Sequence, residues 1–95
     1  MASHRVERAY AGKTSREIFD RAARILDELS TRYALKHQSE PDKLSGKVTR
    51  AGVEGRYQVS GDRLILDLEF GFLIPGVLRQ RVQDEAAGRL ERLFA

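Results

Sequence analysis

The chain has 95 residues, of which 41% are hydrophobic and 33% charged, and it contains no cysteine. A chain of this length forms one domain and buries roughly 60 to 70% of the surface that it exposes when unfolded. Without cysteine it has no disulfide, no thiolate nucleophile and no cysteine-ligated zinc. We therefore predict a single soluble domain over residues 1–95, too small to enclose a large active site.

The placement of charge argues against a nucleic-acid partner, although the formal net charge is +3. In the first predicted helix, three carboxylates each precede an arginine by four residues, which favours helix ion pairs: Glu17 and Arg21, Asp20 and Arg24, Glu28 and Arg32. The longest stretch without a carboxylate, residues 45–53, holds only Lys47 and Arg50. Phosphate binding needs a cluster of unneutralised cations, so we expect no nucleic acid.

The sequence contains no apolar run that approaches the roughly 20 residues of a membrane span. Its first eight residues are mostly polar and lack the apolar core of a signal sequence. We therefore expect no membrane span and a cytoplasmic protein.

The first elements are a strand and a long helix. Residues 4–10 alternate weakly between apolar and charged positions, which predicts an edge strand. Thr14 and Glu17 then have the spacing of a capping box at a helix start. Apolar residues follow at helical spacing: Ile18, Ala22, Ile25, Leu26, Leu29 and Tyr33. This pattern predicts a helix over residues 15–36, about 33 Å long, which can cross a four-stranded sheet.

The middle of the chain predicts a loop and three strands. Residues 37–43 are polar and contain Pro41, which is typical of a mobile loop. Strands are predicted over 44–50, 53–60 and 63–70, joined by tight turns at the glycines between them. The last strand alternates most strictly, with four apolar residues on one face: Leu64, Leu66, Leu68 and Phe70.

A second amphipathic helix is predicted over residues 75–93, opened by Pro75. Its apolar face consists of Leu78, Val82, Ala86, Leu90 and Leu93. The complete prediction is an α+β domain with the order β-α-β-β-β-α. Its mostly antiparallel four-stranded sheet carries both helices on one face.

The chain resembles the polyhydroxyalkanoic acid system protein family. The resemblance is carried by Gly52-Val53-Glu54-Gly55, the Gly61-Asp62 hairpin, the strand ending Phe70-Gly71-Phe72-Leu73 and the terminal helix. The N-terminal strand and first helix also fit, so the resemblance covers essentially the whole chain. It implies a small bacterial protein of storage-polyester metabolism with a shortened helix-grip shape. These motifs report fold, so the resemblance implies no catalytic residue and no cofactor.

One stretch departs from the family pattern. Ile74-Pro75-Gly76 stands where more helix-compatible residues are expected after the Gly-Phe-Leu motif. The start of the last helix is therefore the least defined of the predicted boundaries.

One carboxylate pair could support catalysis. Asp67 and Glu69 share a face of the last predicted strand, about 7 Å apart, where two carboxylates can act as acid and base. On a solvent-facing strand we instead expect them to pair with Lys47, Arg50 or Arg56.

Motifs for other chemistry are missing from the sequence. His4 and His37 are far apart and lack the neighbours of a metal site. No serine lies in a Gly-x-Ser-x-Gly elbow, and no glycine-rich loop joins a strand to a helix. We therefore predict that the protein is not an enzyme and uses no metal or cofactor.

The uncharged segment 70–77 is the candidate contact surface. Its apolar side chains are Phe70, Phe72, Leu73, Ile74 and Val77. Either they complete the core, or some stay accessible and meet a polyester surface, an acyl chain or another subunit. Tyr57 allows the same two interpretations, because an amphipathic ring suits a core edge or a pocket mouth.

Three function classes are compatible with these observations. We favour a non-enzymatic accessory protein of polyhydroxyalkanoate storage, which contacts the granule surface or other storage-system proteins through apolar side chains. The second class is a carrier with a cavity between sheet and helices for a hydrophobic small molecule. The third is a homodimeric interaction module, joined through strand edges or through the outer sheet face around Ile65.

Overall fold

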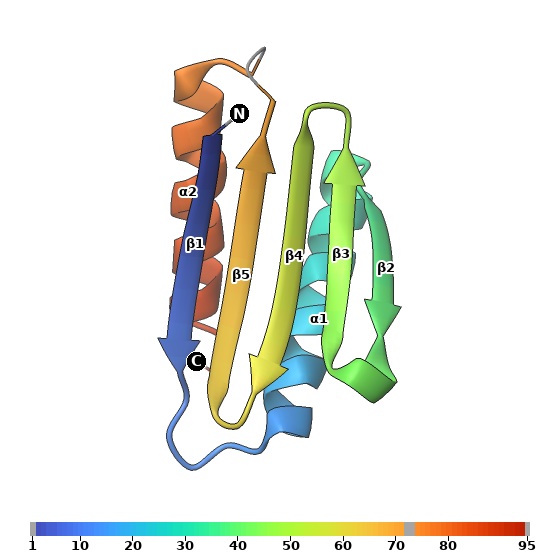
Figure 1. Cartoon of the computed structure of the whole chain (residues 1–95), viewed down its shortest axis with the longest axis vertical. Helices are drawn as coiled ribbons and strands as arrows, with labels where there is room; N and C mark the ends of the chain where they lie inside the picture. Colours follow the sequence, from blue (N-terminus) through green and yellow to red (C-terminus); the bar gives the residue numbers. More distant parts are fainter. Residues whose placement is uncertain (1, 72–73, 95) are drawn as a thin grey trace.

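The computed structural model describes residues 2–71 and 74–94, which form one antiparallel sheet covered on one face by two helices (Figure 1). The strands are β1 (Ala2–Ala9), β2 (Lys36–Glu40), β3 (Ser45–Arg50), β4 (Val53–Ser60) and β5 (Arg63–Phe70). The helices are α1 (Ser15–Tyr33) and α2 (Gly76–Glu91), with a short 3₁₀ turn, η1 (Pro41–Lys43). The predicted α+β class is confirmed.

The sheet has five strands rather than the predicted four, in the order β1-β5-β4-β3-β2. The prediction of a loop over residues 37–43 was wrong, because Lys36–Glu40 pairs with β3, with His37 opposite Val48. This strand lies at the sheet edge and exposes four of its five residues, so it lacks the apolar alternation that marks a strand. Pro41 opens η1 instead of a loop. The element order is therefore β-α-β-β-β-β-α.

Helix α1 begins with the predicted capping box. The Thr14 hydroxyl accepts a hydrogen bond from the Glu17 N–H at 3.1 Å, and the Glu17 carboxylate accepts one from the Thr14 N–H at 3.4 Å. The helix ends at Tyr33, before the predicted boundary, because Ala34 adopts a left-handed conformation with φ 57°. This turn directs the chain into β2.

The core lies between the sheet and the helices. The predicted alternation of the last strand is confirmed, since Leu64, Leu66, Leu68 and Phe70 are buried. They pack with residues of both helices and the neighbouring strands: Ile18, Phe19, Ala22, Leu90, Leu93, Tyr57, Val59 and Val6. Most of the folding free energy therefore comes from burial on one face of the sheet.

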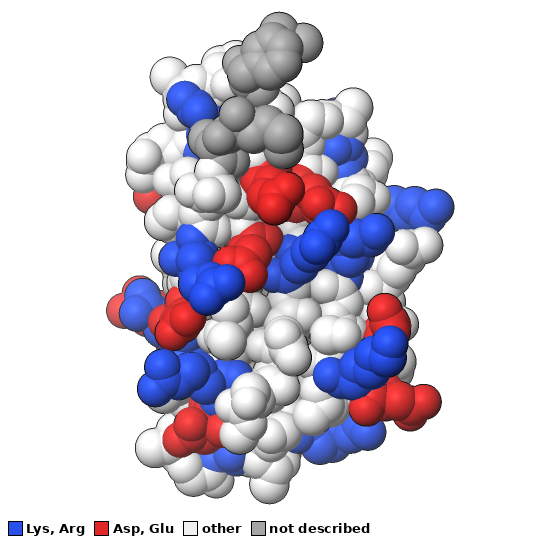
Figure 2. Space-filling model, in the orientation of Figure 1, with Lys and Arg blue, Asp and Glu red and all other residues white. Residues whose placement is uncertain are grey.

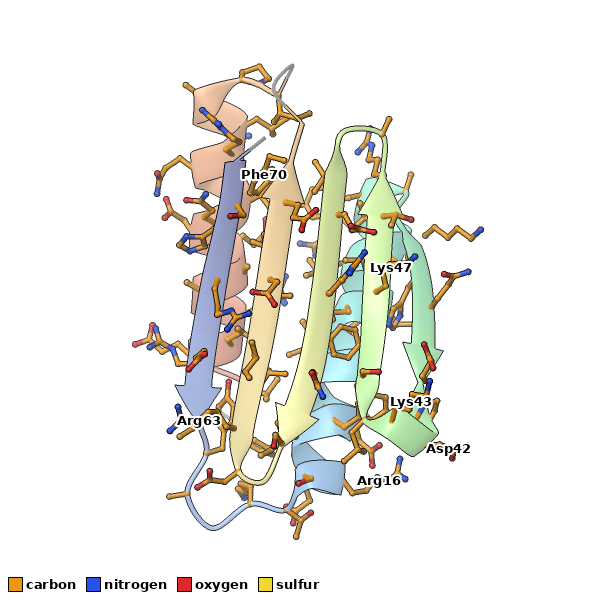
Figure 3. All side chains as sticks on the ribbon, in the orientation of Figure 1. Arg16, Asp42, Lys43, Lys47, Arg63 and Phe70 are labelled. Carbon is orange, nitrogen blue, oxygen red and sulfur yellow. The ribbon has the colours of Figure 1, made fainter. Side chains whose placement is uncertain are left out.

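The outer face of the sheet carries mixed charge. Figure 2 views this face and shows Lys and Arg side chains interspersed with Asp and Glu. An open hollow of about 640 Å³ lies on it, lined by polar and charged residues that include Arg5, Gln38, Lys47 and Arg56. Lys47 projects from β3 in Figure 3.

Helix α2 is anchored by its C-terminal half. Leu90 is buried, Val82 and Ala86 are half-buried, and Leu93, just after the helix end, is buried as well. The first turn, however, extends beyond the core. Within residues 2–71 and 74–94, neither helix is long and apolar enough to cross a membrane.

Candidate functional site

Two residues of the predicted contact surface belong to the core instead. Phe70 has no exposed surface, and Tyr57 is only 2% exposed. Phe70 is the last residue of β5 and faces the helices, as Leu64, Leu66 and Leu68 do; Figure 3 labels it near the start of α2. Because both rings are enclosed by the core, neither can meet an external apolar partner.

The rest of the predicted surface is divided. Phe72 and Leu73 lie outside the described residues. Ile74 is half-buried and packs against the core, with its Cδ1 atom 2.8 Å from where a Cβ on Gly52 would lie. Gly52 has φ 83°, a conformation that suits glycine. Glycine at this position therefore allows both the tight turn and the close approach of the Ile74 side chain. Ile74 therefore closes the end of the core.

Exposed apolar surface gathers at the first turn of α2. Val77 is 81% exposed and Leu78 43%, and among the described residues Tyr33 is the other large hydrophobic residue with an exposed side chain. We call Val77 and Leu78 the apolar turn. Leu78 was predicted to face the core, but the helix overhangs the sheet at this end. Val77 is the apolar side chain of segment 70–77 that is exposed among the described residues, and Leu78 adjoins it.

The apolar turn lacks the usual polar groups of a helix start. Pro75 occupies the N-cap position and makes no side-chain hydrogen bond, and the first turn has no acidic residue. Capping side chains normally satisfy the free N–H groups at this position. The first turn of α2 therefore presents apolar side chains next to backbone N–H groups that no capping side chain satisfies.

A narrow apolar crevice runs between the two helices. Ile25 and Leu29 of α1 line one side, Ala86 and Leu90 of α2 the other, and its volume is about 40 Å³. Ligand pockets for small molecules usually measure about 300 to 1,000 Å³. The crevice therefore has room for little more than a small alkyl group.

A chain of three hydrogen-bonded side chains lies at the edge of the core. The Asp27 carboxylate is 3.0 Å from His37 Nδ1, and His37 Nε2 is 2.8 Å from the Tyr57 hydroxyl. A carboxylate can only accept, so in neutral His37 the Nδ1–H donates to Asp27 and Nε2 accepts from Tyr57. Burial, with a smaller contribution from Asp27, raises the pKa of Tyr57 to about 12. The chain satisfies a buried histidine and a buried tyrosine together.

Sequence reasoning missed this chain. His37 was considered only as a metal ligand, and its partners lie 10 residues before it and 20 after it. No spacing rule joins a helix, an edge strand and a central strand. Only the register of the sheet brings them together.

The predicted carboxylate pair lies on the outer face. Asp67 accepts hydrogen bonds from Arg5 Nε at 2.7 Å and Arg5 Nη2 at 3.2 Å. Its partner is therefore Arg5 of β1 rather than Lys47, Arg50 or Arg56. Glu69 lies opposite Ser3 on β1 and Glu54 on β4. Both carboxylates are partly exposed and lie outside the core.

Metal-ligating side chains do not cluster in the part of the chain that the structure describes. No group of three or more His, Asp or Glu residues there could hold a metal ion. His4 and His37 lie on the two opposite edge strands of the sheet.

Fold and surface together define a small α+β protein with a one-sided helical layer and an exposed apolar turn. The family model of polyhydroxyalkanoic acid system proteins (PHA_gran_rgn) matches residues 5–94, and the chain belongs to this family. The resemblance seen in the sequence is thereby confirmed.

Comparison with solved structures shows the same fold in a distant protein. The crystal structure of TTHA0849 from Thermus thermophilus matches with a TM-score of 0.58 and 15% sequence identity. The match covers 97% of this chain and 91% of that one. Curated proteins gave no match.

Proposed function

We propose that this protein is a cytoplasmic, non-enzymatic accessory protein of polyhydroxyalkanoate storage. It contacts the apolar surface of the stored polyester through the apolar turn, Val77 and Leu78. The observation that carries the proposal is the 81% exposure of Val77 beside the 43% exposure of Leu78.

Energetics support an apolar partner for this turn. Burying apolar surface gains about 25 cal/mol per Å², and the two side chains now face water. A polyester surface offers alkyl groups and ester carbonyls, so it can cover the side chains without leaving a buried charge unpaired. Membership of the polyhydroxyalkanoic acid system family supports the storage context.

Satisfied polar groups support a role without catalysis. Asp27, His37 and Tyr57 use their hydrogen-bonding groups on one another, and Asp67 pairs with Arg5. General acid and base catalysis requires such groups to face a substrate. The protein therefore acts through contact in this proposal.

A carrier function has weaker support. The crevice between the helices holds about 40 Å³, well below the volume of a ligand pocket. A carrier would have to open the helical layer and expose the core.

Granule fractionation tests the proposal. The full chain, carrying a tag, is expressed in cells with and without polyester granules, and its share in the granule fraction is measured. We expect the wild type to sediment with the granules and the Val77→Asp/Leu78→Asp variant to stay in the supernatant. Acids in the first helical turn are compatible with the helix dipole, so this variant should fold.

The matched control is Arg79→Gln/Arg81→Gln on the same helix. It changes the net charge by the same two units but keeps the apolar turn, so it should sediment like the wild type. The proposal of an apolar contact at this turn would be contradicted if the wild type did not sediment with granules. It would also be contradicted if the control variant lost binding as Val77→Asp/Leu78→Asp does.

A further inference from the structure

Strand β2 leaves one edge of the sheet open. Within residues 2–71 and 74–94 it pairs with β3 alone, so its other edge has no strand beside it. Between Lys36 and Glu40 it contains neither proline nor glycine. An open edge of this kind is a template for a further strand.

The direction of its backbone groups follows from the ladder. The Val59 N–H donates to the Leu44 carbonyl, which makes β3 residues 44, 46 and 48 face β4. Residues 45, 47 and 49 therefore face β2, where they meet Glu40, Gln38 and Lys36. It follows that the N–H and C=O groups of His37 and Ser39 point outward at the open edge.

The sequence of β2 is complementary to itself in antiparallel pairing. When Gln38 lies opposite Gln38 of a second copy, His37 meets Ser39 of the second copy in a hydrogen-bonded pair. The same register places Lys36 opposite Glu40 of the second copy, and the reverse, on the outer face. Opposite charges at facing positions stabilise antiparallel strands. Four backbone hydrogen bonds and two ion pairs result.

Shifted registers are worse. Only His37 and Ser39 point their backbone groups outward, so the second strand can shift only by two residues at a time. A shift in one direction places His37 opposite His37 of the second copy, and a shift in the other direction places Ser39 opposite Ser39. Each step shortens the overlap to three residues and separates Lys36 from Glu40. The centred register therefore uses the whole strand and both charges.

The helical layer leaves room at this edge. Figure 1 shows α1 behind β3 and β4, with its C-terminal end next to the start of β2, while α2 lies behind β1 at the opposite edge. Helices are about 10 Å wide and strands about 4.8 Å apart, so two copies paired through β1 would bring their α2 helices into the same space. A second copy therefore fits better at β2.

We propose that the open edge of β2 binds the same edge of a second copy of this chain, giving a two-fold symmetric dimer with a continuous ten-stranded sheet. The contact involves one five-residue strand per copy and is smaller than the roughly 1,600 Å² of a standard interface. The dimer consequently dissociates on dilution.

The symmetry has a consequence that rests on the proposed function. A two-fold axis perpendicular to the sheet keeps both helical layers on one side. Both apolar turns then lie on the helical side of the continuous sheet, at opposite ends of it along the strands, and an extended polyester surface on that side can be contacted twice by one dimer. Mass measurement tests the dimer without granules, so its outcome is separate from that of fractionation.

Sedimentation equilibrium of the full chain at low ionic strength tests the dimer. The chain mass is 10.8 kDa, and the wild type should approach twice this mass as its concentration rises. Lys36→Glu places two pairs of glutamates face to face, and Glu40→Lys two pairs of lysines. Each variant alone should dimerise about tenfold more weakly.

A mixture of the two variants gives the sharpest result. In the mixed dimer the Lys36→Glu chain presents two glutamates and the Glu40→Lys chain two lysines, so both facing pairs again join opposite charges and the mixture should dimerise like the wild type. The double variant Lys36→Glu/Glu40→Lys restores the same pairing between identical chains. This charge-swapped chain again places a lysine opposite a glutamate at both ends, so it should dimerise like the wild type.

Ser39→Pro is a second test, because it removes an outward N–H and leaves the ladder to β3 intact, so it should weaken the dimer without unfolding the sheet. A wild type that keeps the single-chain mass at its highest soluble concentration, or a charge-swapped chain that stays monomeric, would overturn the proposal.

Discussion

Tyr57 lies across Gly46, its register partner on the neighbouring strand, and fills the space that a Cβ atom would occupy there. From this position its hydroxyl reaches His37 Nε2 on the edge strand. The absence of a side chain at residue 46 therefore makes the Asp27-His37-Tyr57 chain possible, and it ties α1, β4 and β2 together.

Gly46→Ala should destabilise the protein. The added methyl group would overlap the ring and hydroxyl of Tyr57, which must move and break its bond to His37. Overpacking costs about 1 to 3 kcal/mol, more than the 0.4 to about 1 kcal/mol gained from a stiffer unfolded chain. Urea unfolding measures the difference. Unchanged or increased stability would show that the ring has room to move aside.

Gly88→Ala is the matched replacement and should have the opposite sign. Gly88 lies inside α2, and a Cβ there would meet only the end of the Arg92 side chain, at 3.5 Å. Alanine in a helix interior is more stable than glycine by about 1 kcal/mol. The same urea titration should therefore show a gain, and a loss would mean that α2 packs more closely here than the structure indicates.

Tyr57→Phe should change how stability depends on pH. The folded-state pKa of Tyr57 is about 12 and its ordinary value is 10, so the folded state holds this proton more tightly. Its contribution to stability is complete below pH 10 and is lost as the pH rises from 10 to 12. The loss amounts to about 2 to 3 kcal/mol, and Tyr57→Phe removes it.

Unfolding at pH 9 and at the alkaline end of this window separates the effects. At pH 9 the variant is less stable by about 1 to 3 kcal/mol, because His37 Nε2 loses its partner. The gap between variant and wild type should narrow as the pH rises. Parallel stability curves would show that Tyr57 does not titrate in the folded protein within this range.

Sequence patterns correctly predicted those elements whose apolar residues recur at regular spacing and face the core. The capping box at Thr14 and the alternation from Leu64 to Phe70 depend on neighbours within the same element, so they were visible in the sequence. The resemblance through glycine turns and apolar strand positions likewise identified the family.

The missed features depend on distant residues. The residues of β2 are polar because the strand lies at an edge, and nothing in His37 to Glu40 distinguishes such a strand from a loop. Phe70 and Tyr57 of the candidate surface are buried, and the sequence did not reveal this for a related reason. An aromatic residue on a strand is buried or exposed according to whether a helix covers it, and the sequence alone does not show where the helices lie over the sheet.

Val77→Asp should stabilise α2 slightly, which tests the exposure on which the proposed function depends. The helix has no acidic residue in its first turn and no capping side chain, so an aspartate there meets the positive end of the helix dipole. We expect a gain of about 0.3 to 1 kcal/mol at low ionic strength, reduced by salt. Val77→Lys, with the opposite charge, should show no gain. If Val77→Asp were instead strongly destabilising, Val77 would be packed in solution, and the apolar turn would not be free to meet a polyester surface.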